Sequence, residues 1–124
     1  MIECIRTSIT VQTRFECIHC WPEAPEEEYY LRQPHRHVMF VIACIEVKHN
    51  DRELEFIHVK HSLDCYLQTT HFGLCVSCED IAHRVAKYLH SQYGDRNISV
   101  CVKEDNENGA IVDYVREELL NEED

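Results

Sequence analysis

The sequence has no long apolar run and no excess of basic residues. Because no run of apolar residues is long enough to cross a bilayer as a helix, a membrane span is not expected. Residues 1–6 lack the basic start and the apolar stretch of a secretion signal, so a cytoplasmic location is expected. The formal net charge of −11 repels phosphate backbones and anionic lipid surfaces. Nucleic acid and membranes are therefore not expected as partners.

Internal repeats and low-complexity linkers are also missing, which favours one domain. A chain of 124 residues holds one compact core but is too short for two ordinary domains. We therefore expect a single domain over residues 1–124. Its acidic end, residues 115–124, is expected to form a tail or a short terminal helix that frays.

Histidine and cysteine, by contrast, are abundant, with nine and eight copies. The cytosol keeps thiols reduced, so these cysteines are expected to be small buried residues, metal ligands or reactive thiols rather than disulfides. Histidine is the side chain most often used for metal binding and proton transfer near neutral pH. Both residue types are thus candidates for a metal site.

The first half of the chain predicts strands around a loop. Residues 2–20 alternate loosely, which predicts one long strand with a bulge or two short strands. Two prolines and an acidic run predict a loop over residues 22–34. Residues 35–48 predict a strand that is apolar on both faces and covered on both sides. After a turn at residues 49–52, the alternation of residues 53–59 predicts a returning strand.

The second half predicts helices followed by a hairpin. Residues 60–71 are expected to form a short helix, and residues 77–94 a longer one, with Ser-Cys-Glu-Asp as its cap and glycine as its end. Residues 98–102 and 110–114 predict two strands that are joined by a turn at residues 106–109. The fold class is therefore α+β, with a four-stranded antiparallel sheet and helices on one face.

Two histidines, His35 and His37, stand at the start of the second predicted strand. Side chains two residues apart in a strand point to the same side, so both can reach one ion if that face lines a cavity. His19 ends the first strand region and supplies a third ligand if the two strands pair. Three imidazoles leave an open position for water or substrate, as in catalytic Zn²⁺ sites. The alternative is three solvent-exposed histidines at strand ends.

A rival zinc site uses two Cys-x-x-Cys pairs, Cys17 with Cys20 and Cys75 with Cys78. This paired spacing is a strong zinc signal in a cytosolic protein. However, residues 17 and 20 of a regular strand face opposite sides, and neither pair is followed by a glycine-rich knuckle. Small buried thiols are the favoured alternative.

Glu104 follows the strand at residues 98–102 in phase with its apolar face. Its carboxylate is expected either to point into the interior or to stand in solvent at the strand end. A buried carboxylate needs partners. The amino-amide edge of a pterin or guanine-like ring donates to both carboxylate oxygens at once, so Glu104 is a candidate for binding such a ring.

Together these features resemble the family of 6-pyruvoyl-tetrahydropterin and 6-carboxy-tetrahydropterin synthases. Short segments keep the family's order over about residues 15–114. Phe15–His19 resembles the family's aromatic residue and histidine near the end of strand one, and His35-Arg36-His37 resembles its His-Gly-His motif. Leu63–Leu67 is similar to the Leu-Asp-His segment, and Ser77–Ala82 is similar to the Thr-Ser-Glu start of the long helix. Lys103–Asp105 resembles the Lys-Glu-Thr end of the last matching strand.

The resemblance implies the tunnelling fold, in which subunits assemble as a trimer or hexamer around a barrel, with active sites between subunits. It implies that His19, His35 and His37 bind Zn²⁺ and that Glu104 anchors the ring. The implied activity is that of a zinc-dependent lyase acting on a small-molecule substrate of the dihydroneopterin triphosphate type, in a tetrahydropterin or deazaguanine (queuosine) pathway.

The chain also departs from the family pattern. The family's proton-abstracting cysteine precedes His-Gly-His, where this chain has only Tyr30, Leu31 and Arg32. Cys65 replaces the histidine that follows the family's aspartate. Arg36 replaces the glycine of His-Gly-His, and its side chain is expected either to leave the site or to line it with positive charge. A non-catalytic member that binds a pterin or purine-like ligand is therefore the alternative.

Other residues could replace the missing groups. Asp64 and His71 are the candidates for a proton relay, and Glu26–Glu28 could supply a carboxylate base. Arg32, Arg36 or Lys60 could hold the triphosphate of the substrate.

Overall fold

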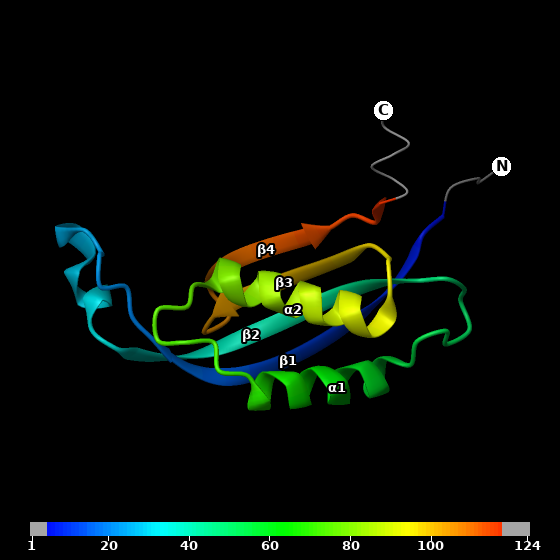
Figure 1. The fold of residues 1–124 in the computed structure, drawn as a ribbon, viewed down its shortest axis with the longest axis horizontal. Coiled ribbons are helices and arrows are strands. Elements are labelled where there is room, and N and C mark those ends of the chain that lie inside the picture. The colour runs from blue at the N-terminus through cyan, green and yellow to red at the C-terminus, as the bar shows by residue number, and fades with distance from the viewer. Residues whose placement is uncertain (1–4, 118–124) are drawn as a thin grey trace.

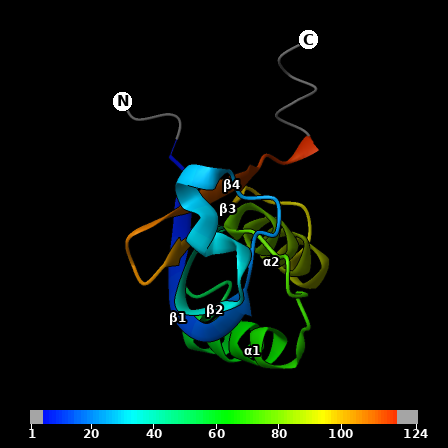
Figure 2. The ribbon, with the colours of Figure 1, turned by 90° about the vertical axis from the view of Figure 1, so that its left-hand side faces the viewer.

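The computed structural model describes residues 5–117, which form a four-stranded antiparallel sheet with two helices packed on one face (Figures 1 and 2). The strands lie side by side in chain order: β1 (Thr7–His19), β2 (His35–Val47), β3 (Ile98–Glu104) and β4 (Asn108–Tyr114). Helices α1 (Phe56–Thr69) and α2 (Cys78–Tyr93) lie between β2 and β3 in the sequence. The predicted α+β class, with helices on one face, is confirmed. No helix of residues 5–117 is long and apolar enough to span a bilayer.

β1 and β2 pair along their whole length, from Thr7 opposite Val47 to His19 opposite His35. The register has no interruption, so the predicted bulge or break in the first strand is wrong. In the connection between these strands, η1 (Glu26–Arg32) is a short 3₁₀ helix where a plain loop was predicted. This connection extends beyond the end of the sheet in Figure 1.

The hydrophobic core lies between the sheet and the two helices. α2 begins where the Ser77 side chain accepts a hydrogen bond from the Asp80 amide, and it ends at Gly94, whose φ of 88° suits glycine. Its apolar residues recur every three or four positions, so one face packs on β3 and β4. Burial of each Val, Leu or Ile side chain contributes about 1.5–3 kcal/mol to the stability of the fold. The buried residues of α2 are Cys78, Ile81, Ala82, Val85, Ala86 and Leu89.

The predicted strand over residues 53–59 is wrong. The Glu55 carboxylate accepts a hydrogen bond from the Ile57 amide, and helix α1 begins at Phe56. Val59, Leu63 and Leu67 are spaced four apart and form the buried face of this helix. The short alternation before them was therefore the start of a helical pattern that only the following residues reveal.

The second face of the sheet is uncovered in the single chain. In β2 every second residue is buried under the helices, whereas Val38, Phe40, Ile42 and Cys44 on the other face are only half-buried. The prediction that β2 is covered on both sides is therefore wrong for one chain. An apolar row crosses this face through Ile42 and Cys101 to Ile111, of which 65% is exposed.

The hairpin turn between β3 and β4 is tighter than predicted. It comprises Asp105–Glu107, and Asn108 and Gly109 already belong to β4. The Glu107 amide donates to the Glu104 carbonyl oxygen at 2.9 Å, while Asp105 and Asn106 have positive φ angles. Both residue types tolerate this left-handed conformation. The predicted acidic tail, residues 115–124, lies outside the described residues from position 118 onwards.

Candidate metal centre

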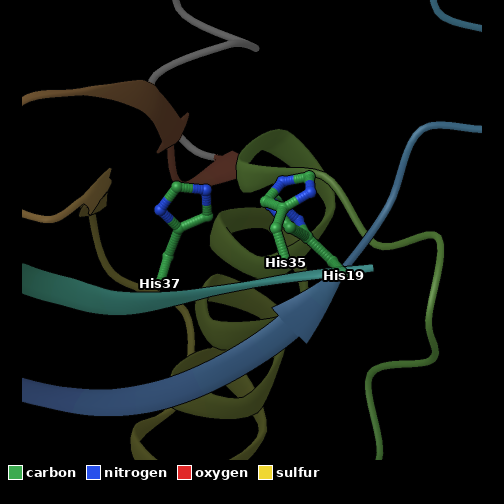
Figure 3. A group of neighbouring side chains, drawn as sticks. All are labelled: His19, His35 and His37. Carbon is green, nitrogen blue, oxygen red and sulfur yellow. The ribbon is translucent and has the colours of Figure 1, made fainter. Parts of the chain in front are cut away.

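The register of β1 and β2 brings three histidines together at one end of the sheet. His19 lies directly opposite His35, and His37 lies two residues further along β2. All three side chains rise from the same face of the sheet (Figure 3). One ring nitrogen from each lies within 4.8 Å of the others, and no other group of three such potential ligands occurs in residues 5–117. The structure thus gathers the three predicted ligands.

Each imidazole is held through its Nδ1 atom by an oxygen that can only accept a hydrogen bond. The acceptors are the Val76 carbonyl for His19 at 2.8 Å, the Gln33 carbonyl for His35 at 2.9 Å, and Oδ2 of Asp105 for His37 at 2.6 Å. In the neutral form of each ring, Nδ1 therefore carries the proton. This outer-sphere arrangement is typical of metal-binding histidines, because it leaves the Nε2 lone pair free for the ion.

The Nε2 atoms of His19 and His37 are buried and have no hydrogen-bond partner within the described part of the chain. Carboxylate oxygens of Glu104 lie 3.2 Å and 3.5 Å from them, but without hydrogen-bond geometry. Buried polar atoms without a partner are costly, and a bound cation would satisfy both nitrogens. The residues present therefore fit a divalent metal ion with nitrogen ligands, such as Zn²⁺.

Glu104 lies beside His19 and His37, on the same face of β3 as the buried Ile98, Val100 and Val102. The Cys78 thiol donates to its Oε1 atom at 3.8 Å. Burial, followed by the charge of Glu104, raises the pKa of Cys78 to about 12. Cys78 is thus a neutral thiol at physiological pH, which can donate a hydrogen bond to the carboxylate.

A pocket of about 560 Å³ opens beside His19, His35 and Glu104. Trp21 and Leu31 supply apolar walls, and the first turn of α2 forms another side. A pocket with apolar walls and a few converging polar groups is the usual form of a small-molecule site.

The four cysteines of the rival site do not meet at one point. Cys20 contacts Cys75, and burial, followed by this neighbouring thiol, raises the pKa of Cys20. Cys17 and Cys78 instead face Glu104, whose charge adds to the effect of burial in raising the pKa of both thiols. The paired spacing therefore reflects two separate contacts, and the structure does not form a four-cysteine zinc site.

Arg36 leaves the site. It lies between the two histidines of β2, so its side chain points to the opposite face of the sheet and pairs with Glu16 at 2.7 Å. This ion pair lowers the pKa of Glu16. Of the two positions expected for Arg36, the structure thus shows the one outside the pocket of its own chain, and its role in binding substrate stays a prediction.

The predicted relay residues lie elsewhere in the chain. Asp64 accepts hydrogen bonds from Thr13 and from Lys60, and Thr13 is six positions from His19 along β1, roughly 20 Å away. His71 is exposed and lines a separate groove beside Phe15. Within one chain, the structure brings neither residue to the histidines.

Arg32 and Glu26–Glu28, the candidates for binding triphosphate and for a carboxylate base, lie in the connection between β1 and β2. Arg32 donates to the Ala24 carbonyl and pairs with exposed Glu26 at 3.1 Å. Both side chains thus have a partner within this connection, and neither lines the pocket. They stabilise the connection that carries the chain from His19 to His35.

Sequence reasoning missed two groups. Asp105, which orients His37, enters the sequence analysis only as the last residue of the Lys103–Asp105 motif. Its position directly after a strand that ends at the site was a usable signal for a role there. Cys75 lines the pocket with an exposed thiol and was considered only as a zinc ligand. No local pattern reveals this placement, because it depends on how the segment before α2 crosses the end of β1.

No family model matches the sequence, and no match is found among the curated proteins. The functional argument therefore rests on the geometry of the site. Three imidazoles suit Zn²⁺ and other divalent first-row metals, whereas Mg²⁺ and Ca²⁺ prefer oxygen ligands.

We expect Asp105→Asn to weaken zinc binding by about 10- to 100-fold. The amide nitrogen of asparagine would donate toward Nδ1 of His37 and move the ring proton to Nε2, which removes a ligand lone pair. Zinc affinity is measured by competition with a chromogenic chelator. The control is Asp113→Asn on the uncovered face of β4, and equal affinities for the two variants would contradict the assigned orientation of His37.

Proposed function

We propose that the chain is a divergent pterin-synthase-like lyase, which holds Zn²⁺ on His19, His35 and His37 and acts on a substrate of the dihydroneopterin triphosphate type. The tetrahydropterin and deazaguanine pathways contain such reactions. The observation that carries the proposal is the convergence of three imidazoles, each anchored through its Nδ1 atom, at the edge of a pocket. The order of sequence motifs supplies the substrate class.

The proposed fold is the tunnelling fold, and the proposed assembly is a trimer or hexamer around a barrel. A four-stranded antiparallel sheet with helices on one face agrees with the unit that the resemblance implies. Among the described strands, β1 and β4 are edges with unpaired backbone groups. Together with the uncovered apolar face, these edges favour association with further copies of the chain.

When bound, the metal ion would polarise a hydroxyl or carbonyl oxygen of the substrate and so acidify the neighbouring carbon. The chain's own residues support this chemistry in two ways. Val76, Gln33 and Asp105 keep the imidazoles in the ligand tautomer, and the apolar walls restrict water. A general base is still needed to take the proton.

Cys75 is the proposed base. The stretch before His35 contains no thiol, but Cys75 lines the pocket together with His19 and His35, and its side chain is exposed. Neighbouring Cys20 is buried with a raised pKa, so it remains a protonated thiol. Asp64 and His71 would serve the reaction only from a neighbouring subunit, as sites between subunits would allow.

Among residues 5–117, no lysine or arginine lines the pocket. The triphosphate of the proposed substrate would therefore need cations from a neighbouring subunit. The same observation favours a second candidate, a non-catalytic protein of the same fold that binds a pterin or purine-like ligand without a triphosphate.

His35→Ala is expected to abolish stoichiometric zinc binding, because two imidazoles remain of the three. Cys17→Ala is the matched control and is expected to retain zinc, since this thiol is protonated and belongs to no ligand cluster in the described chain. Metal content of the purified variants is measured by elemental analysis. Zinc loss with Cys17→Ala alone would contradict the histidine site.

The zinc-loaded protein is expected to convert dihydroneopterin triphosphate to pterin products, which chromatography with fluorescence detection reveals. The His35→Ala variant is the control and should give none. A fully zinc-loaded wild-type protein without turnover would contradict the lyase and favour the binding protein.

Cys75→Ser is expected to lower turnover at least about 100-fold, the usual contribution of a positioned general base. Zinc content should not change, because the thiol is not a ligand. Cys65→Ser is the control: it also removes an exposed thiol, but one that lies on α1 outside the pocket. Equal turnover of both variants would exclude Cys75 as the base.

Light scattering is expected to give three or six times the mass of one chain. Ile111→Lys, on the uncovered sheet face, should lower this mass, since a charge cannot be buried there without a partner. Ile57→Lys, at a comparably exposed position on α1, is the control and should leave it unchanged. A monomeric wild-type protein would contradict the assembly.

A further inference from the structure

We infer that Cys20 and Cys75 form a redox-active pair in the wall of the pocket, which closes to a disulfide when the protein meets a low-molecular-weight disulfide such as oxidised glutathione. Each cysteine comes from a different Cys-x-x-Cys motif, so the spacing of the motifs does not predict this pair. The reaction of the two thiols does not depend on the proposed activity.

The backbone holds the two cysteines next to each other. The Cys20 amide donates a hydrogen bond to the Leu74 carbonyl oxygen at 2.8 Å. Because Cys75 follows this carbonyl group by one peptide bond, standard bond lengths limit the distance between the Cα atoms of the two cysteines to about 7 Å. Disulfides usually join Cα atoms that are about 4.4–6.8 Å apart. The two thiols also contact each other, so the bond can form without a large movement of the backbone.

The two thiols differ in exposure. Cys75 is exposed, whereas Cys20 is buried, with 8% of its surface accessible, and both line the pocket. An incoming disulfide therefore reaches Cys75 first. An accessible cysteine beside a second, resolving cysteine is the usual arrangement of redox-sensing pairs.

The reaction consists of two successive thiol–disulfide exchanges. The thiolate of Cys75 attacks one sulfur of oxidised glutathione, which forms a mixed disulfide and releases one glutathione. The sulfur of Cys20 then attacks the sulfur of Cys75 and releases the second glutathione. The protons of the two thiols end on the released glutathione molecules. One glutathione disulfide is thereby reduced while Cys20 and Cys75 are oxidised, and excess dithiothreitol reverses the reaction.

The two Cys-x-x-Cys motifs would instead favour bonds within each motif, and the structure disfavours both. The Cys78 thiol donates to Glu104, and burial, followed by the charge of this carboxylate, raises its pKa to about 12. Little thiolate is therefore present at Cys78 to attack a disulfide. Cys17 also faces Glu104. The contact between Cys20 and Cys75 is thus the one that is ready to react.

The disulfide would change the pocket beside the histidines. It would take up the Cys75 thiol and join the segment before α2 covalently to the end of β1. Oxidation should therefore stop the proposed turnover, and reduction should restore it. This consequence alone rests on the proposed function, in which Cys75 is the base.

The test incubates the reduced full-length protein with oxidised glutathione and alkylates the thiols that remain. Mass spectrometry of a protease digest, with fragmentation of the linked peptides, identifies the bonded sulfur atoms. We expect a bond between Cys20 and Cys75 that dithiothreitol removes. A bond within either Cys-x-x-Cys motif in its place, glutathione retained on Cys75, or an unmodified Cys75 would overturn the inference.

Two variants test the order of the reaction, and circular dichroism shows whether each is folded. Cys20→Ser should retain glutathione on Cys75, because the resolving thiol is missing. Cys78→Ser is the matched control and should form the same bond as the wild type. Loss of the bond in folded Cys78→Ser would contradict the pair. If Cys20→Ser does not fold, the wild-type digest and Cys78→Ser still decide.

Turnover assays separate this inference from the proposed function. If the bond forms but the reduced, zinc-loaded protein gives no pterin products, the redox pair stands and the lyase fails. If turnover is unchanged in the fully oxidised protein, the pair again stands and only Cys75 as the base is excluded.

Discussion

The candidate centre depends on the uninterrupted pairing of β1 with β2. Because side chains alternate along a strand, a slip of one residue in this register would turn His35 and His37 away from the helices and put Arg36 in their place. The buried face of β2 prevents such a slip, since it would expose Met39, Val41 and their apolar neighbours. The hydrophobic core therefore fixes the geometry of three polar side chains that lie beyond its edge.

Two other segments complete the centre by meeting the end of this strand pair. The segment before α2 crosses β1, where the Cys20 amide donates to the Leu74 carbonyl and His19 donates to Val76. The β3–β4 turn reaches it from the other side, where the Asp105 carboxylate accepts from the Val38 amide as well as from His37. These bonds lower the pKa of Asp105 and keep it charged. Two imidazoles are thus oriented by backbone carbonyls, and the third by a carboxylate that the turn holds in place.

The sequence predicted those parts of the site that follow from local periodicity. The alternation at His35 and His37, and the phase of Glu104 in β3, required only that these residues be in strands. The same rule places Arg36 on the opposite face, which the structure shows. What local periodicity could not supply was the partner of each side chain, because Glu104 meets His19 and His37 only through the register of three strands. The prediction of a strand at residues 53–59 was wrong for a related reason. Short apolar patterns fit a strand and a helix equally well, and only Leu63 and Leu67 extend this one into a helical pattern.

Within the described chain, the pocket contains candidate metal ligands but not the cations that the proposed substrate needs. The three histidines and the groups that orient them come from one chain, so the proposed metal site does not need a second subunit. The cations for a triphosphate do not line this pocket, and Asp64 lies far along β1. For the proposed function, a subunit with candidate metal ligands but without cations for a triphosphate is expected where the active site lies between subunits. The uncovered apolar face and the free edges of the sheet offer the surfaces through which a second copy would bring those charges.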